Sequence, residues 1–343
     1  MTTKKSILLG LLMLPLSLAL AQDNIAADPE RMEQRIKALS EHGANADGGV
    51  DRVAFSEADI AGRAYIMELM KGAGLVTSVD VAGNIIGRRE GSEPDLPPIL
   101  FGSHIDSVPG GGNYDGDVGV IDAIEVIELL EANNIRTRHP LEVVVFSDEE
   151  GGLTGSRAMA GKIDDDTLNV MSHSGMTIGE GIRALGGDPD RLDQARRQPG
   201  EIKAFIELHI EQGAILDEED IDIGVVEGIV GIRWWDVTIE GFANHAGTTP
   251  MNRRWDAMVT AAEYVLMVNE VATSMPGTQV ATVGRIHAAP GAPNVIPGEV
   301  VLSLDIRELS AEKIQRVFDE IRAAGERIAE ARAPPYRYEE IAV

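Results

Sequence analysis

Three apolar stretches of the chain each end abruptly in polar residues. They are PPILFGSHID at 97–106, PLEVVVFSDEEGG at 140–152 and IKAFIELHIEQG at 202–213. Apolar residues at helical spacing fill 57–73 and 117–134. Strands that alternate with helices indicate an α/β domain with a central, mostly parallel sheet. Because ligands bind at the carboxyl ends of such strands, we predict that the three polar clusters form one site.

The pattern changes after Gly213. Long segments of alternating polar and apolar residues follow at 228–242, 278–289 and 298–309, and helical patterns at 254–272 and 310–331 separate them. This combination is typical of an α+β domain with its own sheet. We predict a first domain over 22–213 with a short return at 331–343, and an inserted second domain over 214–330.

The composition excludes several classes of protein. Lys and Arg number 30 and Asp and Glu number 56, so the formal net charge is −26. Nucleic acids and anionic membranes recruit basic residues, so neither is expected as a partner. The chain has no cysteine, which excludes disulfides, thiol nucleophiles and thiolate metal ligands. A metal site would therefore have to consist of His, Asp and Glu.

The first residues have the composition of a secretory signal peptide. Lys4 and Lys5 precede an apolar run from Ile7 to Ala21, which ends in Ala-Leu-Ala before a polar stretch. A membrane anchor or a buried helix is the alternative, but the run is short and contains Pro15. We expect cleavage after residue 21, export to a periplasm, and no membrane association of the mature chain.

The first polar cluster contains His104, Asp106 and Asp115. On an extended segment, His104 could bind a metal through one ring nitrogen while Asp106 holds the other nitrogen. Asp115 would add an oxygen ligand from a glycine-rich loop. The glycines at 110–112 could instead form a plain turn or a phosphate cradle, but the Gly-Lys-Ser/Thr ending of a phosphate-binding loop is missing.

The other two clusters add Glu149, Glu150 and His209. An acidic run is usually a solvated face, and a single His at the end of a strand is usually a core residue. Here the acids directly follow a buried strand, so Glu150 could bind a metal while Glu149 acts as general base. Taken with the first cluster, the candidate ligands suit Zn²⁺, with Mn²⁺ or Co²⁺ as alternatives; they are His104, Asp115, Glu150 and His209.

The second domain holds candidate substrate-binding residues. The strings NHAGTTPM at 244–251, PNVIPG at 293–298 and DIR at 305–307 stand at the ends of predicted elements or on a predicted strand. Arg307 could bind a carboxylate through both of its terminal nitrogens. From spacing alone, a pairing of Arg307 with Asp305 or Glu308 is the simpler interpretation.

These strings occur in one order, and together they resemble the metal-dependent amidase/hydantoinase/carbamoylase family. The family includes N-carbamoyl-L-amino acid hydrolases, β-ureidopropionases and allantoate amidohydrolases, and the similarity runs from about residue 30 to about residue 332. HIEQG and HAGTTPM are specific to this branch. The resemblance implies a catalytic α/β domain with an inserted lid that dimerises through its sheet.

The resemblance also implies a role for each motif residue. Two divalent ions, expected to be Zn²⁺, would be bound at one centre, and Asp115 would bridge them. A hydroxide between the ions would attack the linear amide or ureido carbonyl of a small substrate that carries a carboxylate. The assignments are metal binding by His104, Asp115, Glu150 and His209, general base Glu149, oxyanion stabilisation in a neighbouring subunit by His245, and substrate binding by Gln212, Asn294 and Arg307.

The sequence departs from the family pattern at its C-terminal end. Relatives continue into a further strand and helix with a Ser-Gly-Ala-Gly-His-Asp-like motif whose His completes the second metal site, and no such string occurs here. The expectation is therefore a C-terminally truncated member, for which a catalytically impaired relative is an alternative to an active enzyme. Within the active class, an aminoacylase or dipeptidase is the alternative to a carbamoyl hydrolase.

Overall fold

The computed structural model describes residues 25–164, 166–332 and 336–341. The chain forms two compact units, Met1–Asp220 and Ile221–Val343, so the boundary falls after Asp220 rather than after Gly213 as predicted. The predicted signal peptide lies outside the described residues. Among those described, no helix combines the length and the apolar composition that a membrane crossing requires.

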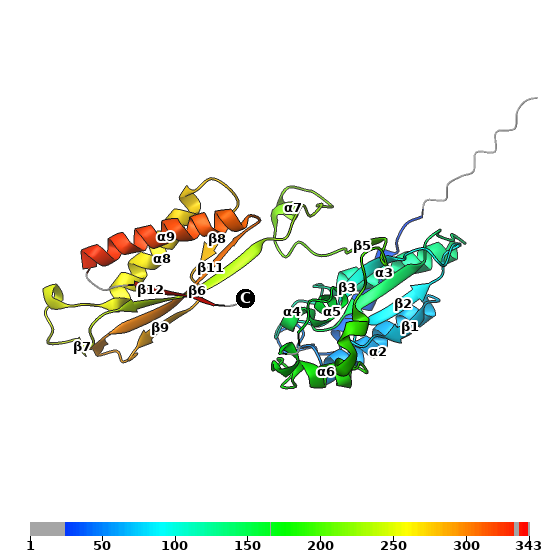
Figure 1. Cartoon of the computed structure of the whole chain (residues 1–343), viewed down its shortest axis with the longest axis horizontal. Helices are drawn as coiled ribbons and strands as arrows, with labels where there is room; N and C mark the ends of the chain where they lie inside the picture. The colour runs from blue at the N-terminus through cyan, green and yellow to red at the C-terminus, as the bar shows by residue number, and fades with distance from the viewer. Residues whose placement is uncertain (1–24, 165, 333–335, 342–343) are drawn as a thin grey trace, which may run out of the picture. The chain divides into compact units, whose positions relative to one another are not determined.

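The first unit is built on a five-stranded sheet in the order β1-β2-β4-β3-β5 (Figure 1). Strands β4, β3 and β5 run parallel to one another, while β2 runs antiparallel to both β1 and β4. Gly83 and Asn84 lie in the short connection between β1 and β2. The strands are β1 (Val76–Val79), β2 (Ile85–Arg89), β3 (Ile99–His104), β4 (Leu141–Phe146) and β5 (Ala204–Ile206).

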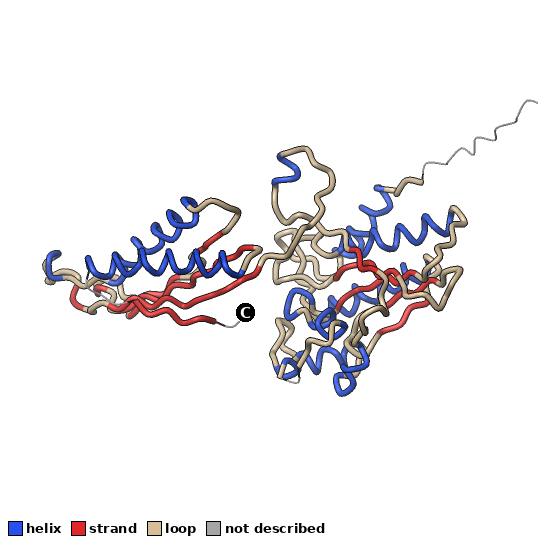
Figure 2. The backbone as a smooth tube through the Cα atoms, turned by 45° about the horizontal axis from the view of Figure 1, so that its top comes forward, coloured by secondary structure: helices blue, strands red, loops and turns tan. Residues whose placement is uncertain are grey.

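Both faces of β4, in the middle of this sheet, are covered, which explains its almost continuous apolar sequence. All six residues of β4 are buried. Val143 and Val145 pack against α1, α2 and α3, whereas Val144 and Phe146 join a smaller cluster on the opposite face. Figure 2 shows the helices of the unit in blue and its strands in red. The helices of the unit are α1 (Pro29–Ser40), α2 (Glu57–Gly72), α3 (Asp117–Ala132), α4 (Glu149–Gly152), α5 (Thr154–Met159), α6 (Ile178–Ala184) and α7 (Ile215–Glu218).

The second unit is an antiparallel sheet with two helices on one face (Figures 1 and 2). The sheet order is β12-β6-β11-β8, and β9 also pairs with β11. The α+β architecture predicted for this part of the chain is therefore confirmed. The elements are β6 (Gly231–Glu240), β7 (Asn244–His245), α8 (Ala257–Ser274), β8 (Val280–Thr282), β9 (Ile286–Ala289), β10 (Val295–Ile296), β11 (Glu299–Glu308), α9 (Ala311–Arg332) and β12 (Tyr336–Ile341).

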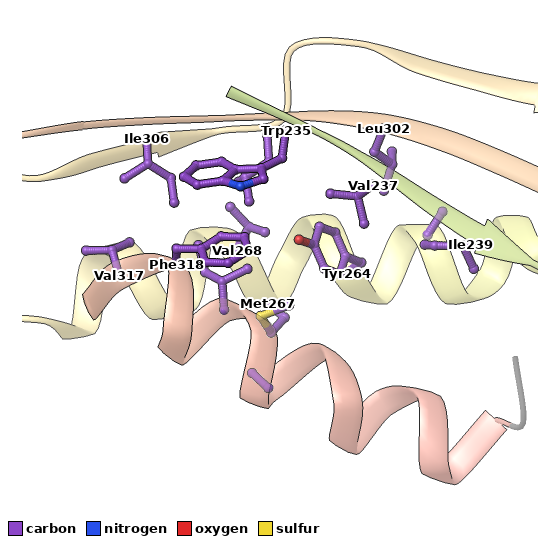
Figure 3. Packing of buried hydrophobic residues seen from close by; sticks show 14 of the residues in the cluster. Trp235, Val237, Ile239, Tyr264, Met267, Val268, Leu302, Ile306, Val317 and Phe318 are labelled. Carbon is purple, nitrogen blue, oxygen red and sulfur yellow. The ribbon is translucent and has the colours of Figure 1, made fainter. Parts of the chain in front are cut away.

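The core of the second unit lies between its sheet and its two helices (Figure 3). Every second residue of β11 points into it, so Val300, Leu302, Leu304 and Ile306 are fully buried. Trp235 of β6 stacks on Phe318 of α9 with ring centroids 4.3 Å apart. The alternation that predicts strands here thus marks the face of the sheet that the helices cover.

The C-terminal segment corrects one prediction. We expected residues 331–343 to return to the first domain, but β12 pairs with β6 in the sheet of the second unit, with Tyr338 opposite Val237. Without β12, the outer edge of β6 would present unpaired backbone donors and acceptors, and β12 pairs with them. In addition, the ring of Tyr338 packs edge-on against Phe318 at a centroid distance of 5.5 Å.

Candidate metal centre

The three parallel strands bring the three polar clusters of the first unit to one edge of the sheet. His104 is the last residue of β3 and lies opposite Phe146, the last residue of β4. Glu149 and Glu150 follow β4 directly, in α4. His209 follows β5, which pairs with β3 on its other side. The predicted convergence of these clusters at the carboxyl ends of the strands is therefore observed.

His104, Asp115 and His209 form a group whose ligand atoms all lie within 4.8 Å of one another. Oδ1 of Asp115 is 3.1 Å from Nε2 of His209 and 4.0 Å from Nε2 of His104. This Oδ1 is buried and accepts no hydrogen bond from any described residue. The group lies within the first unit, with His104 only 2% exposed.

The hydrogen bonds of the two imidazole rings show that a cation fits between them. Nδ1 of His104 is 2.9 Å from the Asp106 carbonyl oxygen, and Nδ1 of His209 is 2.9 Å from the Ile210 carbonyl oxygen. A carbonyl oxygen only accepts, so each Nδ1 carries a hydrogen, and in the neutral ring each Nε2 then has a lone pair on the side of Asp115. Two such nitrogens and an unpaired carboxylate oxygen are the donor set of a divalent metal site.

Gly116 allows the close approach of Asp115 to His104. A Cβ atom at this position would lie 2.6 Å from Nε2 of His104, and the φ of +68° is one that favours glycine. The same residue precedes α3 and turns the chain from the loop into the helix. The glycine therefore has a steric role beside the metal ligands, in addition to the loop flexibility predicted from the sequence.

Asp106 does not hold the ring of His104 through its side chain, which corrects another prediction. Its backbone carbonyl binds Nδ1, while the nearer carboxylate oxygen is 3.8 Å from that nitrogen. The carboxylate instead accepts hydrogen bonds from the backbone N–H groups of Glu149 at 3.2 Å and Glu150 at 3.1 Å. These N–H groups open a helical turn and have no partner within it. Asp106 thus orients the segment that carries the two glutamates.

Glu149 is the acid nearest to the imidazole of His104. Its Oε2 lies 3.6 Å from Nε2 of His104, and its side chain remains 32% exposed. Burial raises the pKa of Glu149, and the nearby His104 partly opposes this shift. Burial by itself would lower the pKa of His104, but Asp106 and Glu149 outweigh it, and the pKa is raised. The geometry gives Glu149 the position that a general base needs.

Glu150 and Gln212 stand differently from what the sequence suggested. Glu150 is not one of the three residues whose ligand atoms converge, although burial raises the pKa of its carboxyl group. Gln212, predicted to bind substrate, donates from Nε2 to Oδ2 of Asp115 at 2.6 Å. Its backbone has a φ of +55°, which turns the side chain back toward the metal ligands. Gln212 therefore holds the second oxygen of Asp115.

The remaining predicted residues lie in the second unit. The strand β7 that contains His245 pairs with β10, and the Asn294 carbonyl accepts a hydrogen bond from Ala246, so His245 and Asn294 are neighbours. Arg307 instead binds Asp305 through two nitrogens, with Nη2 at 2.9 Å from Oδ2. The simpler interpretation of Arg307 is thus the one observed.

Comparisons with known proteins agree with this fold. Residues 100–312 match the model of Peptidase family M20/M25/M40. The chain is 44% identical over 308 residues to an N-carbamoyl-L-amino acid amidohydrolase of Geobacillus stearothermophilus, covering 88% of this chain and 75% of that protein. It is 36% identical over 321 residues to a ureidoglycolate hydrolase of Arabidopsis thaliana, covering 90% of this chain and 67% of that protein.

A solved structure shows the same fold. It is that of a hydantoinase/carbamoylase family amidase from Burkholderia ambifaria, with a TM-score of 0.85 and 32% identity over 93% of this chain and 79% of that one. The chain is thus a metal-dependent hydrolase of the M20 family. Within that family it belongs to the hydantoinase/carbamoylase amidases, as the resemblance of its motifs implied.

Proposed function

We propose that this chain hydrolyses the ureido C–N bond of an N-carbamoyl-L-amino acid or a closely related ureido acid. The observation that carries the proposal is the convergence of His104, Asp115 and His209 at the strand ends, with Glu149 beside them. The similarity to an N-carbamoyl-L-amino acid amidohydrolase and to a ureidoglycolate hydrolase supports a non-peptide C–N bond as the target. The exact ureido substrate is part of the proposal.

A divalent cation bound by His104, Asp115 and His209 would activate water and polarise the substrate carbonyl. Zn²⁺ is the ion we propose, with Mn²⁺ or Co²⁺ as alternatives, because imidazole and carboxylate ligands suit all three. A second ion, expected from the resemblance, would draw on the carboxylate of Glu150. His104, Glu150 and His209 lie at or just after the ends of three separate strands, so the sheet brings them together, while Asp115 comes from the loop that precedes α3.

Glu149 would take the proton of the attacking water and deliver it to the leaving nitrogen. Its raised pKa makes its carboxylate a better proton acceptor than an exposed glutamate. The Asp106 carboxylate, which binds the backbone N–H of Glu149, holds this residue at the cluster. Part of the Glu149 side chain remains exposed, so water and substrate can reach it.

His245 is suited to donate a hydrogen bond to a developing oxyanion. Its Nδ1 accepts a hydrogen bond from the backbone N–H of Gly247 at 3.1 Å, so in the neutral ring the hydrogen is on Nε2. The side chain is exposed. We propose that His245 serves the catalytic centre of the partner in a homodimer that forms through the second unit.

Asn294 and Arg307 would bind the carboxylate of the substrate. The guanidinium of Arg307 is paired with Asp305 but is still 42% exposed. An exposed ion pair of this kind is worth little free energy, so a substrate carboxylate could replace Asp305 at small cost. Binding of the carboxylate by Asn294 and Arg307 does not require a peptide bond or a free amino group in the substrate.

A largely apolar cavity beside Glu149 favours amino acid derivatives with a sizeable side chain. Its volume is about 560 Å³, and its apolar lining includes Leu100, Phe146, Met159 and Phe205. Charged residues line it as well, namely Glu149, Glu207, Arg196 and Arg197. Such a lining would bind a leucine-like or phenylalanine-like side chain through apolar contacts. Ureidoglycolate and allantoate present only polar groups to it.

The test is a substrate panel with the Glu149→Gln variant as the matched control. We expect the highest kcat/KM for N-carbamoyl-L-leucine or N-carbamoyl-L-phenylalanine, lower values for ureidoglycolate and allantoate, and no turnover by the variant. Faster hydrolysis of N-acetyl-leucine or of a dipeptide would favour the aminoacylase or dipeptidase alternative. No turnover of any substrate by a chain that binds metal would favour the impaired relative.

Export is a separate proposal that rests on the N-terminal sequence alone. Lys4, Lys5 and the apolar run that ends at Ala21 have the pattern of a cleaved signal. N-terminal sequencing of the chain from an expressing cell tests it, together with fractionation of a bacterial host. A protein that retains residues 1–21 in the cytoplasmic fraction would contradict it.

A further inference from the structure

Arg52 is an arginine that is completely buried in the first unit. Only 1% of its surface is exposed, and it lies in the loop between α1 and α2. Its donors all have partners: Nε binds the Ile105 carbonyl at 2.6 Å, Nη1 binds the Leu39 and His42 carbonyls at 3.0 Å, and Nη2 binds both oxygens of Asp117 at 2.9 and 2.6 Å. A planar guanidinium with every donor paired holds its partners in fixed directions.

Two of these partners flank the segment that carries the metal ligands. Ile105 directly follows His104 at the end of β3, and Asp117, the first residue of α3, comes two residues after Asp115. The segment between them, 106–116, contains four glycines. Glycine restrains the backbone less than any other residue, so the sequence of this loop does not fix the position of Asp115 by itself. The guanidinium fixes both ends of the loop.

The backbone of Arg52 adds to this connection. Its carbonyl accepts a hydrogen bond from the N–H of Ser107 at 3.0 Å, and its own N–H donates to the hydroxyl of Ser107 at 3.1 Å. Ser107 lies inside the loop, on the His104 side. Main chain and side chain of one residue therefore bind the start, the interior and the end of the segment that presents the ligands.

Stability alone does not explain a buried ion pair at this place. The side chains of Arg52 and Asp117 are each 1% exposed, and removing two charges from water costs several kcal/mol, which the pairing roughly offsets. The helix α3 is already held by its apolar face and by Glu125, which pairs with Arg31 of α1 at 2.6 Å. The Arg52–Asp117 pair additionally fixes the orientation of the start of α3 relative to the end of β3.

We propose that Arg52 is a positioning residue of the metal centre. By binding Ile105 and Asp117 together it holds His104 and Asp115 at the separation that a single cation requires, before the cation binds. The inference rests on the metal-binding role of these two residues in the proposed function. It assigns to Arg52 and Asp117 an effect on cation affinity, with no contact to the substrate.

The experiment compares two acid-to-amide substitutions on the same helix. Asp117→Asn removes the charge that Arg52 binds, and Glu125→Gln removes the charge that Arg31 binds eight residues further along α3. Both carboxylates are buried, so both variants lose the ion pair of a buried carboxylate, although Arg31 is 39% exposed and Arg52 only 1%. Zn²⁺ affinity is measured on the full chain by competition with a chromophoric chelator, and the free energy of unfolding is measured in the absence of metal.

We expect Asp117→Asn to bind Zn²⁺ about 10- to 100-fold more weakly than the wild type, the usual effect of losing a residue that orients a metal ligand. Glu125→Gln should lose stability but keep the wild-type affinity. If Asp117→Asn does not fold, Arg52→Lys, which keeps the charge but loses the planar fork, gives the same comparison.

Three different outcomes would overturn the inference. Equal affinities of the wild type and Asp117→Asn, with a lower stability of the variant, would reduce the pair to a structural contact while leaving the metal centre intact. A wild-type chain that binds no Zn²⁺, Mn²⁺ or Co²⁺ would instead remove the proposed function itself. A similar loss of affinity in Glu125→Gln would also count against a specific role of Arg52.

Discussion

Asp59 gives the chain a pH-dependent stability that can be measured directly. The residue lies in the first turn of α2, is 2% exposed, and accepts the backbone N–H of Phe55 at 2.8 Å. Burial raises the pKa of its carboxyl group from 3.8 to about 6; Arg63 and Arg52 oppose the shift, and Asp106 adds to it. The folded chain therefore keeps this proton over a pH range in which the unfolded chain releases it.

The sign and size of the effect follow from this difference. Below pH 3.8 both states carry the proton, so the group contributes no pH dependence. Between pH 3.8 and about 6 only the folded state binds it, so stability falls as the pH rises, and above this range the loss is complete. A shift of about 2 pH units corresponds to about 3 kcal/mol.

The assay is urea unfolding of the wild type and Asp59→Asn from pH 4 to pH 7, with chelator present. Asn keeps the size of the side chain and can still accept the hydrogen bond from Phe55. Other titrating groups cancel in the difference between the two proteins, so the wild type should lose about 3 kcal/mol relative to the variant across this range. Glu57→Gln, an exposed substitution on the same helix, is the control. A difference between wild type and Asp59→Asn that stays constant with pH would refute the reasoning.

Three further predictions concern the proposed site. Glu149→Gln should abolish turnover and leave the metal content per chain unchanged; retained turnover would remove Glu149 as the base. Gly116→Ala should lower Zn²⁺ affinity, because its Cβ would meet the ring of His104, and an unchanged affinity would show that the loop adjusts freely. Arg307→Ala should raise KM about 10-fold or more for substrates with a carboxylate, the scale expected when a charge-assisted pair is lost. An equal rise for uncharged amides would remove Arg307 as the carboxylate-binding residue.

The main features of the fold could be predicted because burial leaves a direct trace in the sequence. The strand 141–146 is apolar apart from Glu142, because helices cover one face of its sheet and a smaller cluster covers the other. The strand 299–308 alternates because only one face is covered. The strand 336–341 escaped prediction, since its partner lies about 100 residues earlier in the chain and a short alternating segment does not specify which edge it joins.

Three members of the candidate metal centre, His104, Asp115 and His209, could be predicted, but the position of Glu150 outside this group and the bonds within it could not. Parallel strands with polar ends must bring His104 and His209 to one edge of the sheet. The spacing between His104 and Asp106 does not show whether the Asp106 carboxylate binds the His104 ring or the backbone that follows the neighbouring strand. In the structure the backbone carbonyl of Asp106 accepts a hydrogen bond from the His104 ring, and its carboxylate accepts one from the backbone N–H of Glu149.

The ligands of the centre are oriented by contacts of several kinds, and the sequence alone does not predict these contacts. Gln212 donates a hydrogen bond to Oδ2 of Asp115, and backbone carbonyls accept hydrogen bonds from both imidazole rings. Arg52 binds Ile105 and Asp117, the residues at the two ends of the loop that carries Asp115. The sheet brings the ligands to within several ångströms of one another, which periodicity can reveal. The final positions of the ligand atoms depend on contacts between residues that are far apart in the sequence and share no motif. Arg52 is the clearest case, since it lies 53 residues before Ile105 and 65 before Asp117.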